Sequence, residues 1–297
     1  MPARPFRPLR FYLKIIVITS LLTLASLVCL PAAWLANAVS RPLKSVVCCQ
    51  TPARFGANYE NISFNSLDGL KLSGWYIPPR GKTVIILIHS YYADRRQTLP
   101  VAEMLFKHGY GLLMYDQRAN GESEGQVRSL GWRDIPDLRA AANWLTGRQK
   151  DLRIGAYGCS IGAAIALAGS VGLSSIQAVA LDAPSPLHWS ENLPQFSLSD
   201  PLSLPVIALY YPLVMLRSGA LPPTSTIQAI QDYGTRPILF ISTGQGSESS
   251  RIKAYFELAN GPKQYWNIPD IGHCEGPVSH PQEYQQQLLD FFNFALR

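Results

Sequence analysis

The chain has 297 residues, of which 47% are hydrophobic and 15% are charged. Soluble domains usually carry about 25% charged residues, so this composition excludes a disordered chain and a charged coiled coil. The length favours one large α/β domain together with an additional segment.

The net charge of +6 originates in the first part of the chain. Residues 1–59 contain seven basic side chains and no acidic one, whereas the remaining 238 residues carry 19 basic and 20 acidic groups. The basic residues flank an apolar stretch and do not cluster on the main domain. We therefore predict no nucleic-acid partner.

The apolar stretch is long enough to cross a membrane. Ile15 to Trp34 is a run of 20 residues without a charge, and a helix of that length spans a hydrocarbon core of about 30 Å. We predict a basic tail at 1–14, a transmembrane anchor at 15–36, a linker at 37–53 and the main domain at 54–297. More cations precede the run than closely follow it, which predicts a cytosolic N-terminus and an extracytoplasmic domain.

A cleaved signal peptide is the alternative interpretation of the same segment. Ala36-Asn37-Ala38 supplies the small residues that signal peptidase requires, and cleavage there would release the domain.

The cysteines indicate neither a disulfide framework nor a zinc site, because their number is odd and their spacing matches neither pattern. The chain contains Cys29, Cys48, Cys49, Cys159 and Cys274. We interpret Cys159 and Cys274 as packing residues, and we predict no metal ion or cofactor.

Strand and helix patterns alternate after Pro52. Two strand-like runs at 61–66 and 70–77 meet at an Asp68-Gly69 turn, which predicts an antiparallel hairpin. Next comes TVIILIH at 83–89, a continuous apolar run typical of a strand buried on both faces. Further strands are predicted at 111–115, 153–157, 177–181, 237–242 and 264–268, and helices at 97–108, 135–145, 161–171, 251–259 and 281–296. This alternation predicts a mostly parallel sheet covered by helices.

A long insertion at 183–236 separates two series of this alternation. It contains the apolar run LPVIALYYPLVML at 204–216, and a segment of this length needs structure of its own. We predict a helical lid over the carboxyl ends of the strands, where open α/β sheets bind ligands.

The sequence Gly158-Cys159-Ser160-Ile161-Gly162 follows a predicted strand and opens a predicted helix. This G-x-S-x-G pattern favours a sharp turn that presents the serine hydroxyl above the sheet, at a helix N-terminus. Ser160 is therefore the candidate nucleophile. It requires a base, and His273, after the last strand, has the right place in the order serine, acid, histidine.

At these motifs the chain from about Arg54 to Arg297 resembles the α/β-hydrolase superfamily, and within it the membrane-anchored α/β-hydrolase-domain proteins. The matching stretches are the elbow, TPARFGANYENISFNSLDGLKLSGWYIPP, IHSYYADR, YDQRANGESEG, LDAPSP and the final GH. The resemblance implies the α/β-hydrolase fold with a helical lid. It also implies an oxyanion hole formed by the backbone N–H groups of Tyr91 and Ile161.

The chain departs from the family pattern at three places. Ser90 stands where the family has glycine after His89, and D-Q-R-A-N-G replaces D-x-R-G-x-G at 116–121. We interpret Asp116 and Arg118 there as a structural ion pair. The loop after the strand at 237–242 lacks the usual aspartate, which leaves Glu248 as the candidate acid of the triad and Asp182 as its rival.

These residues predict a serine hydrolase that cleaves an ester or thioester, as carboxylesterases and thioesterases do. The anchor and the apolar insertion favour a small acyl or lipid-like substrate. Two alternatives remain: a binding protein that keeps the fold with a degraded site, and a peptidase of the prolyl-oligopeptidase type.

Overall fold

The structure is a computed structural model that describes residues 8–191, 203–244 and 247–297. Its described residues form one eight-stranded sheet in the order β1-β2-β4-β3-β5-β6-β7-β8. The strands are β1 (Glu60–Asn65), β2 (Lys71–Ile77), β3 (Thr83–Ile88), β4 (Gly111–Tyr115), β5 (Arg153–Cys159), β6 (Ile176–Asp182), β7 (Ile238–Thr243) and β8 (Lys263–Ile268). β2 is antiparallel to β1 and β4, and all other pairs are parallel. The predicted hairpin and parallel sheet are confirmed.

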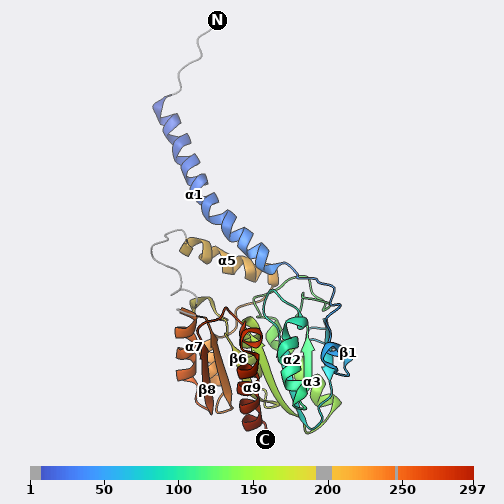
Figure 1. Cartoon of the computed structure of the whole chain (residues 1–297). Helices are drawn as coiled ribbons and strands as arrows, with labels where there is room; N and C mark the ends of the chain where they lie inside the picture. The colour runs from blue at the N-terminus through green and yellow to red at the C-terminus, as the bar shows by residue number, and fades with distance from the viewer. Residues whose placement is uncertain (1–7, 192–202, 245–246) are drawn as a thin grey trace.

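Helices cover both faces of the sheet (Figure 1). One face carries α3 (Asp134–Arg148), α4 (Ile161–Ser170), α6 (Thr226–Asp232) and α7 (Ser247–Leu258), and the other carries α2 (Leu99–Lys107) and α9 (Pro281–Ala295). A short α8 (Gly276–Ser279) and the 3₁₀ helices η1 (Pro52–Phe55), η2 (Arg95–Thr98) and η3 (Trp189–Glu191) complete the domain. Because both faces are covered, β3 is buried along nearly its whole length, as its apolar run predicts.

The strand order marks where a ligand should bind. From β3 the chain moves to β4 on one side and then to β5 on the other side. In open α/β sheets a crevice opens outside the carboxyl ends of the strands at such a reversal. Residues 89–91 follow β3, and the G-x-S-x-G stretch at 158–162 covers the end of β5 and the turn after it, so the fold brings both predicted motifs to this crevice.

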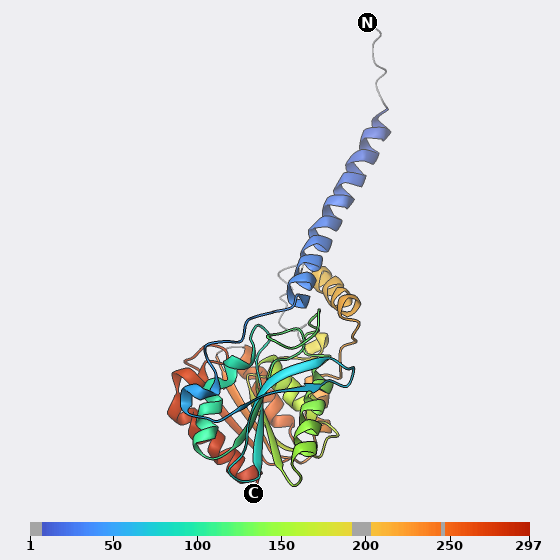
Figure 2. The same cartoon turned by 90° about the vertical axis from the view of Figure 1, so that its right-hand side faces the viewer.

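The predicted lid contains α5 (Ser203–Ser218) and α6, while residues 192–202 of it lie outside the described residues. α5 lies beyond the ends of the strands, between the sheet and the projecting part of the N-terminal helix, and it packs beside the lower part of that helix (Figures 1 and 2). Val214 of α5 is buried with Ala36 and Trp132. The described part of the insertion is therefore largely helical, and α5 packs on the N-terminal helix as well as on the domain.

The N-terminal helix α1 (Leu9–Ser40) has 32 residues, is apolar, and has the length of a membrane span. It starts before and ends after the predicted span at 15–36. Only 6% of its most apolar window is buried, and most of the helix projects away from the domain in Figures 1 and 2.

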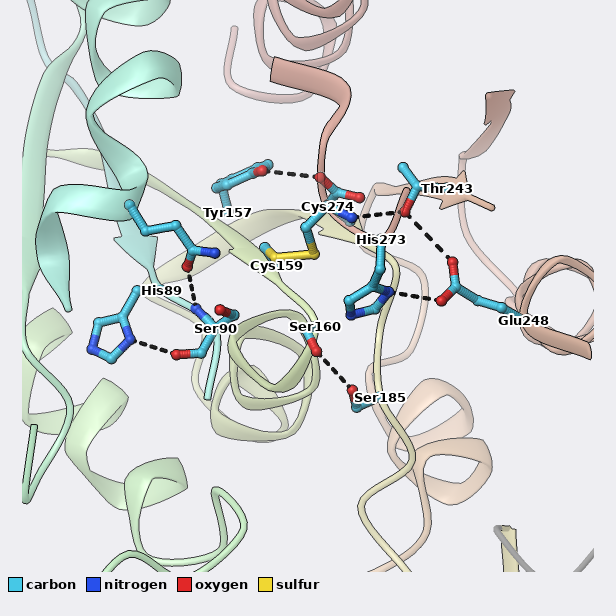
Figure 3. Close-up of a disulfide and its surroundings, with 12 residues drawn as sticks. His89, Ser90, Tyr157, Cys159, Ser160, Ser185, Thr243, Glu248, His273 and Cys274 are labelled. Atoms are coloured by element: carbon cyan, nitrogen blue, oxygen red, sulfur yellow. Dashed lines mark hydrogen bonds and ion pairs between the residues drawn. A yellow bond between two sulfur atoms is a disulfide. The ribbon is translucent and has the colours of Figure 1, made fainter. Parts of the chain in front are cut away.

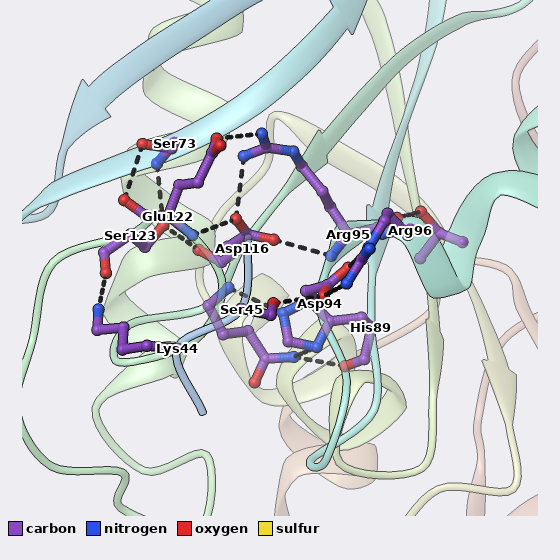
Figure 4. Close-up of polar contacts among 12 residues, drawn as sticks. Lys44, Ser45, Ser73, His89, Asp94, Arg95, Arg96, Asp116, Glu122 and Ser123 are labelled. Carbon is purple, nitrogen blue, oxygen red and sulfur yellow. Dashed lines mark hydrogen bonds and ion pairs between the residues drawn. The ribbon is translucent and has the colours of Figure 1, made fainter. Parts of the chain in front are cut away.

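The C-terminal end of α1 is packed against the domain. Ala32, Ala36 and Ser40 are buried, and the Tyr91 hydroxyl donates a hydrogen bond to the Val39 carbonyl at 2.7 Å. The segment after the helix is also held, as Figure 4 shows. The Lys44 ammonium group donates to the Ser123 carbonyl, and the Ser45 hydroxyl donates to the Asp94 carboxylate at 2.7 Å. The segment after α1 is therefore attached to the domain at Lys44 and Ser45.

Candidate active site

Ser160 occupies a strained turn between β5 and α4. Its backbone has φ 58° and ψ −120°, a conformation that L-residues adopt at a cost of order 1–3 kcal/mol. Two glycines allow the turn. A Cβ at Gly158 would lie 2.2 Å from the backbone of Gly162, and a Cβ at Gly162 would lie 2.4 Å from the Ile88 carbonyl oxygen. The chain thus folds here as G-x-S-x-G predicts, and the Ser160 side chain is partly exposed.

The hydroxyl of Ser160 lies 3.0 Å from the hydroxyl of Ser185, with which it forms a hydrogen bond. The backbone supports the same contact, since the Ser185 N–H donates to the Ser160 carbonyl at 3.2 Å. Ser185 belongs to the LDAPSP stretch at the end of β6, and it is not among the predicted site residues. Its position in that motif is the only signal that could have identified it.

The two predicted oxyanion donors lie at the ends of β3 and β5. Ile161 is the first residue of α4, where a backbone N–H has no partner within the helix. Within the described residues, no hydrogen-bond acceptor is recorded for the N–H of Ile161 or of Tyr91. Arg128 donates to the Tyr91 carbonyl at 2.9 Å and thereby fixes that peptide. Both N–H groups are available to an oxyanion.

His89 shapes the loop that contains Tyr91. Its Nε2 accepts the Gln117 backbone N–H at 3.0 Å, so the ring is neutral with its proton on Nδ1, which donates to the Ser90 carbonyl at 2.7 Å. Burial lowers the pKa of His89 and favours this neutral form. The Ser90 N–H donates to the Gln97 side chain at 2.6 Å. The backbone N–H and carbonyl of Ser90 are therefore both hydrogen-bonded, and the loop accommodates serine at this position.

His273 and Glu248 form a pair on the other side of Ser160 (Figure 3). The Nδ1 of His273 lies 2.7 Å from the Glu248 carboxylate. This hydrogen bond is the main reason why the pKa of His273 is raised above 6.5, while burial acts in the opposite direction. Thr243 Oγ1 lies 3.5 Å from the Glu248 carboxylate and accepts the N–H of Cys274 at 3.0 Å. The structure therefore places a carboxylate where it can orient the imidazole.

Asp182, the rival acid, has other partners. It is fully buried, and its carboxylate accepts hydrogen bonds from the hydroxyls of Tyr284 at 2.6 Å and Tyr157 at 3.2 Å. Burial raises the pKa of Asp182 to about 6. The structure does not bring Asp182 to Nδ1 of His273, the position that Glu248 occupies.

Cys159 and Cys274 form a disulfide, drawn in Figure 3. Their interpretation as simple packing residues is wrong. The sequence gives one signal for this pairing: one cysteine directly precedes Ser160 and the other directly follows His273. That signal becomes visible only when the serine and the histidine are known to meet in space.

The interpretation of Asp116 and Arg118 as partners of one another is also wrong. Asp116 is paired with Arg95 at 2.9 Å (Figure 4), whereas Arg118 binds Asp137 at 2.6 Å and Asp68 at 2.9 Å. Both networks are largely buried and connect the loop after β4 to its neighbours. They support the fold around the crevice.

An apolar cavity of about 450 Å³ lies along α5. Trp189, from the segment that follows Ser185, contributes to its lining, and the remaining lining residues are Leu204, Ile207, Ala208, Tyr211, Pro212 and Met215. Trp189 is four residues from Ser185, a separation that spans at most about 14 Å. No cluster of metal-ligating side chains was found among the described residues.

Comparison with known proteins agrees with this architecture. Residues 68–191 match the family described as X-Pro dipeptidyl-peptidase (S15 family). Protein YfhR of Escherichia coli O157:H7 is 29% identical over 248 residues, which cover 80% of this chain and 81% of YfhR. The α/β-hydrolase domain-containing protein WAV2 of Arabidopsis thaliana is 32% identical over 121 residues, 39% of either chain.

Among solved structures, an esterase of Pyrococcus furiosus superposes with a TM-score of 0.70 at 24% identity and covers 87% of this chain and 99% of its own. The α/β hydrolase GrgF of a Penicillium species gives a TM-score of 0.62 at 18% identity, over 80% of this chain and 99% of its own. These likenesses establish the fold. The chain therefore has the α/β-hydrolase fold, and in sequence it is similar to the matched peptidase family and to these relatives over the stretches given above.

Proposed function

We propose that this protein is a serine hydrolase that cleaves an ester or thioester through an acyl-enzyme on Ser160. The observation that carries the proposal is the 2.7 Å contact between His273 and Glu248. The loop of His273 is joined through the Cys159–Cys274 bond to the strained turn of Ser160. A binding protein with a degraded site would have no need to keep the imidazole oriented or the serine strained. Glu248 is the proposed acid because it contacts His273, which Asp182 does not.

The proposed reaction is acyl transfer in two steps. Ser160 turns from Ser185 towards His273, its oxygen attacks the carbonyl carbon, and Nε2 of His273 takes the hydroxyl proton. The N–H groups of Tyr91 and Ile161 stabilise the oxyanion, and His273 returns the proton to the leaving alcohol or thiol. Water, deprotonated by His273, then attacks the acyl-enzyme and releases the acid. Throughout, Glu248 stabilises the imidazolium.

The apolar surroundings support an acyl or lipid-like substrate. The cavity along α5 is lined by apolar and aromatic side chains, and its described lining includes no charged group. Exposed apolar residues continue from α1 onto α5 and beyond it: Leu216 is 80% exposed and Leu221 is 79% exposed. Surfaces of this kind contact membranes or apolar ligands. We propose that α1 is a membrane anchor with a cytosolic N-terminus, and that the domain lies on the extracytoplasmic side.

The family match makes an X-Pro dipeptidyl-peptidase the second candidate. An enzyme of that type must hold the charged amino terminus of its substrate, which calls for a nearby carboxylate. The described lining of the α5 cavity has none, which favours the ester hydrolase. If the protein hydrolysed Gly-Pro-nitroanilide and cleaved no ester, the peptidase would become the first candidate function.

Labelling with a fluorophosphonate probe tests the proposal on the full chain in detergent. We expect the wild type to be labelled at the peptide that contains Ser160 and the Ser160→Ala variant not to be labelled, because the probe reacts only with an activated serine. Tandem mass spectrometry locates the adduct. Absence of labelling in a folded wild type would instead favour the binding protein.

Filling the α5 cavity tests the substrate class. The substitution Ala208→Trp places an indole in the cavity, so we expect kcat/KM for a C10 nitrophenyl ester to fall at least tenfold while the C2 ester changes less than twofold. A single methylene group bound in an apolar pocket already changes kcat/KM by an amount that corresponds to about 1–3 kcal/mol. Leu209→Trp is the matched control, since Leu209 lies on the same helix outside the lining. Equal losses for both chain lengths would argue against acyl binding at α5.

A further inference from the structure

The disulfide joins the two halves of the candidate catalytic machinery. Cys159 precedes Ser160 at the end of β5, and Cys274 follows His273 in the loop after β8. The two cysteines are 115 residues apart in sequence, and their Cα atoms are 6.1 Å apart. The bond therefore connects the neighbours of the nucleophile and of the base directly.

The sheet itself gives no direct connection between these two loops. β8 pairs with β7 only, and β6 and β7 lie between it and β5. Any displacement of the His273 loop relative to Ser160 would thus have to be resisted through two intervening strands. The disulfide bypasses both strands.

The remaining contacts of the loop lead away from Ser160. The Cys274 N–H donates to Thr243 of β7, and the Gly272 N–H donates to Glu275 within the loop itself. The His273 side chain is 46% exposed, so few neighbours pack against it. Cys274 also holds a positive φ of 62°, which is unfavourable for a residue other than glycine. The imidazole is also bonded to Glu248 of α7, so apart from the disulfide these contacts hold His273 to β7 and α7, and none of them reaches β5 or Ser160.

We propose that the Cys159–Cys274 disulfide is a positioning bond that sets the distance between His273 and Ser160, so that turnover depends on its oxidised state. This inference rests on the proposed hydrolase activity. Formation of the bond removes two protons and two electrons from the two thiols, and the disulfide of a thiol–disulfide oxidoreductase accepts the electrons and becomes a dithiol. Such bonds persist in oxidising compartments, in agreement with an extracytoplasmic domain.

The test uses the full chain with Cys29, Cys48 and Cys49 replaced by serine, so that the only remaining thiols are those of the pair. Dithiothreitol reduces the bond and leaves as its cyclic disulfide, and alkylation followed by mass spectrometry measures the extent of reduction. Activity on a short-chain ester is measured before reduction, after it and after reoxidation. The double variants Cys159→Ala/Cys274→Ala and Cys159→Ser/Cys274→Ser are measured beside it.

We expect reduction to lower kcat about 10- to 100-fold, because a misplacement of about 1 Å can cost 10²-fold in rate. KM should stay within about twofold, reoxidation should restore kcat, and both double variants should have the low kcat and no response to dithiothreitol. A bond that only stabilises the fold would lower Tm and leave kcat unchanged well below Tm.

Several outcomes would overturn the inference. These are free thiols at both positions in the untreated protein, an unchanged kcat after complete reduction, and a loss of activity that occurs only together with loss of the near-UV circular dichroism signal. If a double variant fails to fold, the reduction of the folded protein still decides the question. An oxidised protein that shows neither turnover nor fluorophosphonate labelling contradicts the proposed hydrolase function instead.

Discussion

Replacing Ser160 by alanine is expected to lower kcat by about 10⁴ to 10⁶ without unfolding the protein, and His273→Ala should have an effect of similar size. In the proposed mechanism the two residues act as one unit, because the hydroxyl attacks only when the imidazole accepts its proton. The Ser160→Ala/His273→Ala double variant should therefore lose no more activity than either single variant. Residual hydrolysis above the uncatalysed rate should come from the oxyanion donors at Tyr91 and Ile161.

The measurement is single-turnover hydrolysis of a nitrophenyl ester by the full chain in detergent, with Tm recorded for each variant. Ser190→Ala is a suitable control, since Ser190 is an exposed serine that bonds only to its neighbour His188 in the described structure. If the two single effects multiplied in the double variant, Ser160 and His273 would be acting independently, and the triad assignment would fail.

The second large effect concerns the acid. Glu248→Gln should lower kcat by about 10² to 10⁴, because the amide neither stabilises the imidazolium nor reliably selects the tautomer with the proton on Nδ1. Asp182→Asn keeps the shape of that side chain and should cost less than about tenfold, since its hydrogen bonds come from Tyr284 and Tyr157. Comparison of kcat for the two variants identifies the acid.

The pH profile gives a second readout of the same substitution. His273 must be neutral to act as a base, and its contact with Glu248 raises its pKa, so kcat/KM should fall as the pH drops through that raised value. Loss of the carboxylate lowers the pKa of His273 and should move the acid limb of the profile to lower pH. A limb that moves with Asp182→Asn and not with Glu248→Gln would reassign the acid to Asp182.

The sequence predicts the fold well because its signals are local. A strand buried on both faces has to be continuously apolar, as 83–88 is, and a helix packed tightly on the sheet has to be rich in small residues, as 161–170 is. The elbow is equally local, since close backbone approach at Gly158 and Gly162 admits no side chain. These features follow from residue types within a few positions of each other.

The remaining features of the site depend on contacts between distant segments. The sequence left Glu248 and Asp182 both open because each follows a strand at the same edge of the sheet. Their roles diverge through packing: α7 begins at Ser247, which puts Glu248 in its first turn, whereas Asp182 points into the core among tyrosines. The disulfide was not predicted for the same reason: its cysteines are 115 positions apart in the sequence and meet only in the folded structure.

The ends of α1 also differ from those of the predicted membrane span at 15–36. The predicted span stops at the loss of apolar character, but arginine and lysine are good helix formers and do not end a helix. The helix begins at Leu9 and therefore includes Arg10 and Lys14, and it ends only at Ser40, just before Arg41-Pro42. A residue that precedes proline disfavours helical geometry, which explains this boundary better than hydrophobicity does.

The docked end of α1 also determines how the domain would meet a substrate dissolved in lipid. A domain on a long flexible tether samples many orientations, and its effective concentration at a fixed target falls as the tether lengthens. Here the C-terminal end of α1, α5 and the segment at Lys44 and Ser45 are packed on the domain, so the domain is held directly against the helix that we propose as its anchor. With the membrane anchor and the acyl substrate proposed above, encounter would be two-dimensional diffusion in the membrane plane, and the rate would follow the mole fraction of substrate in the lipid instead of its amount per volume of water.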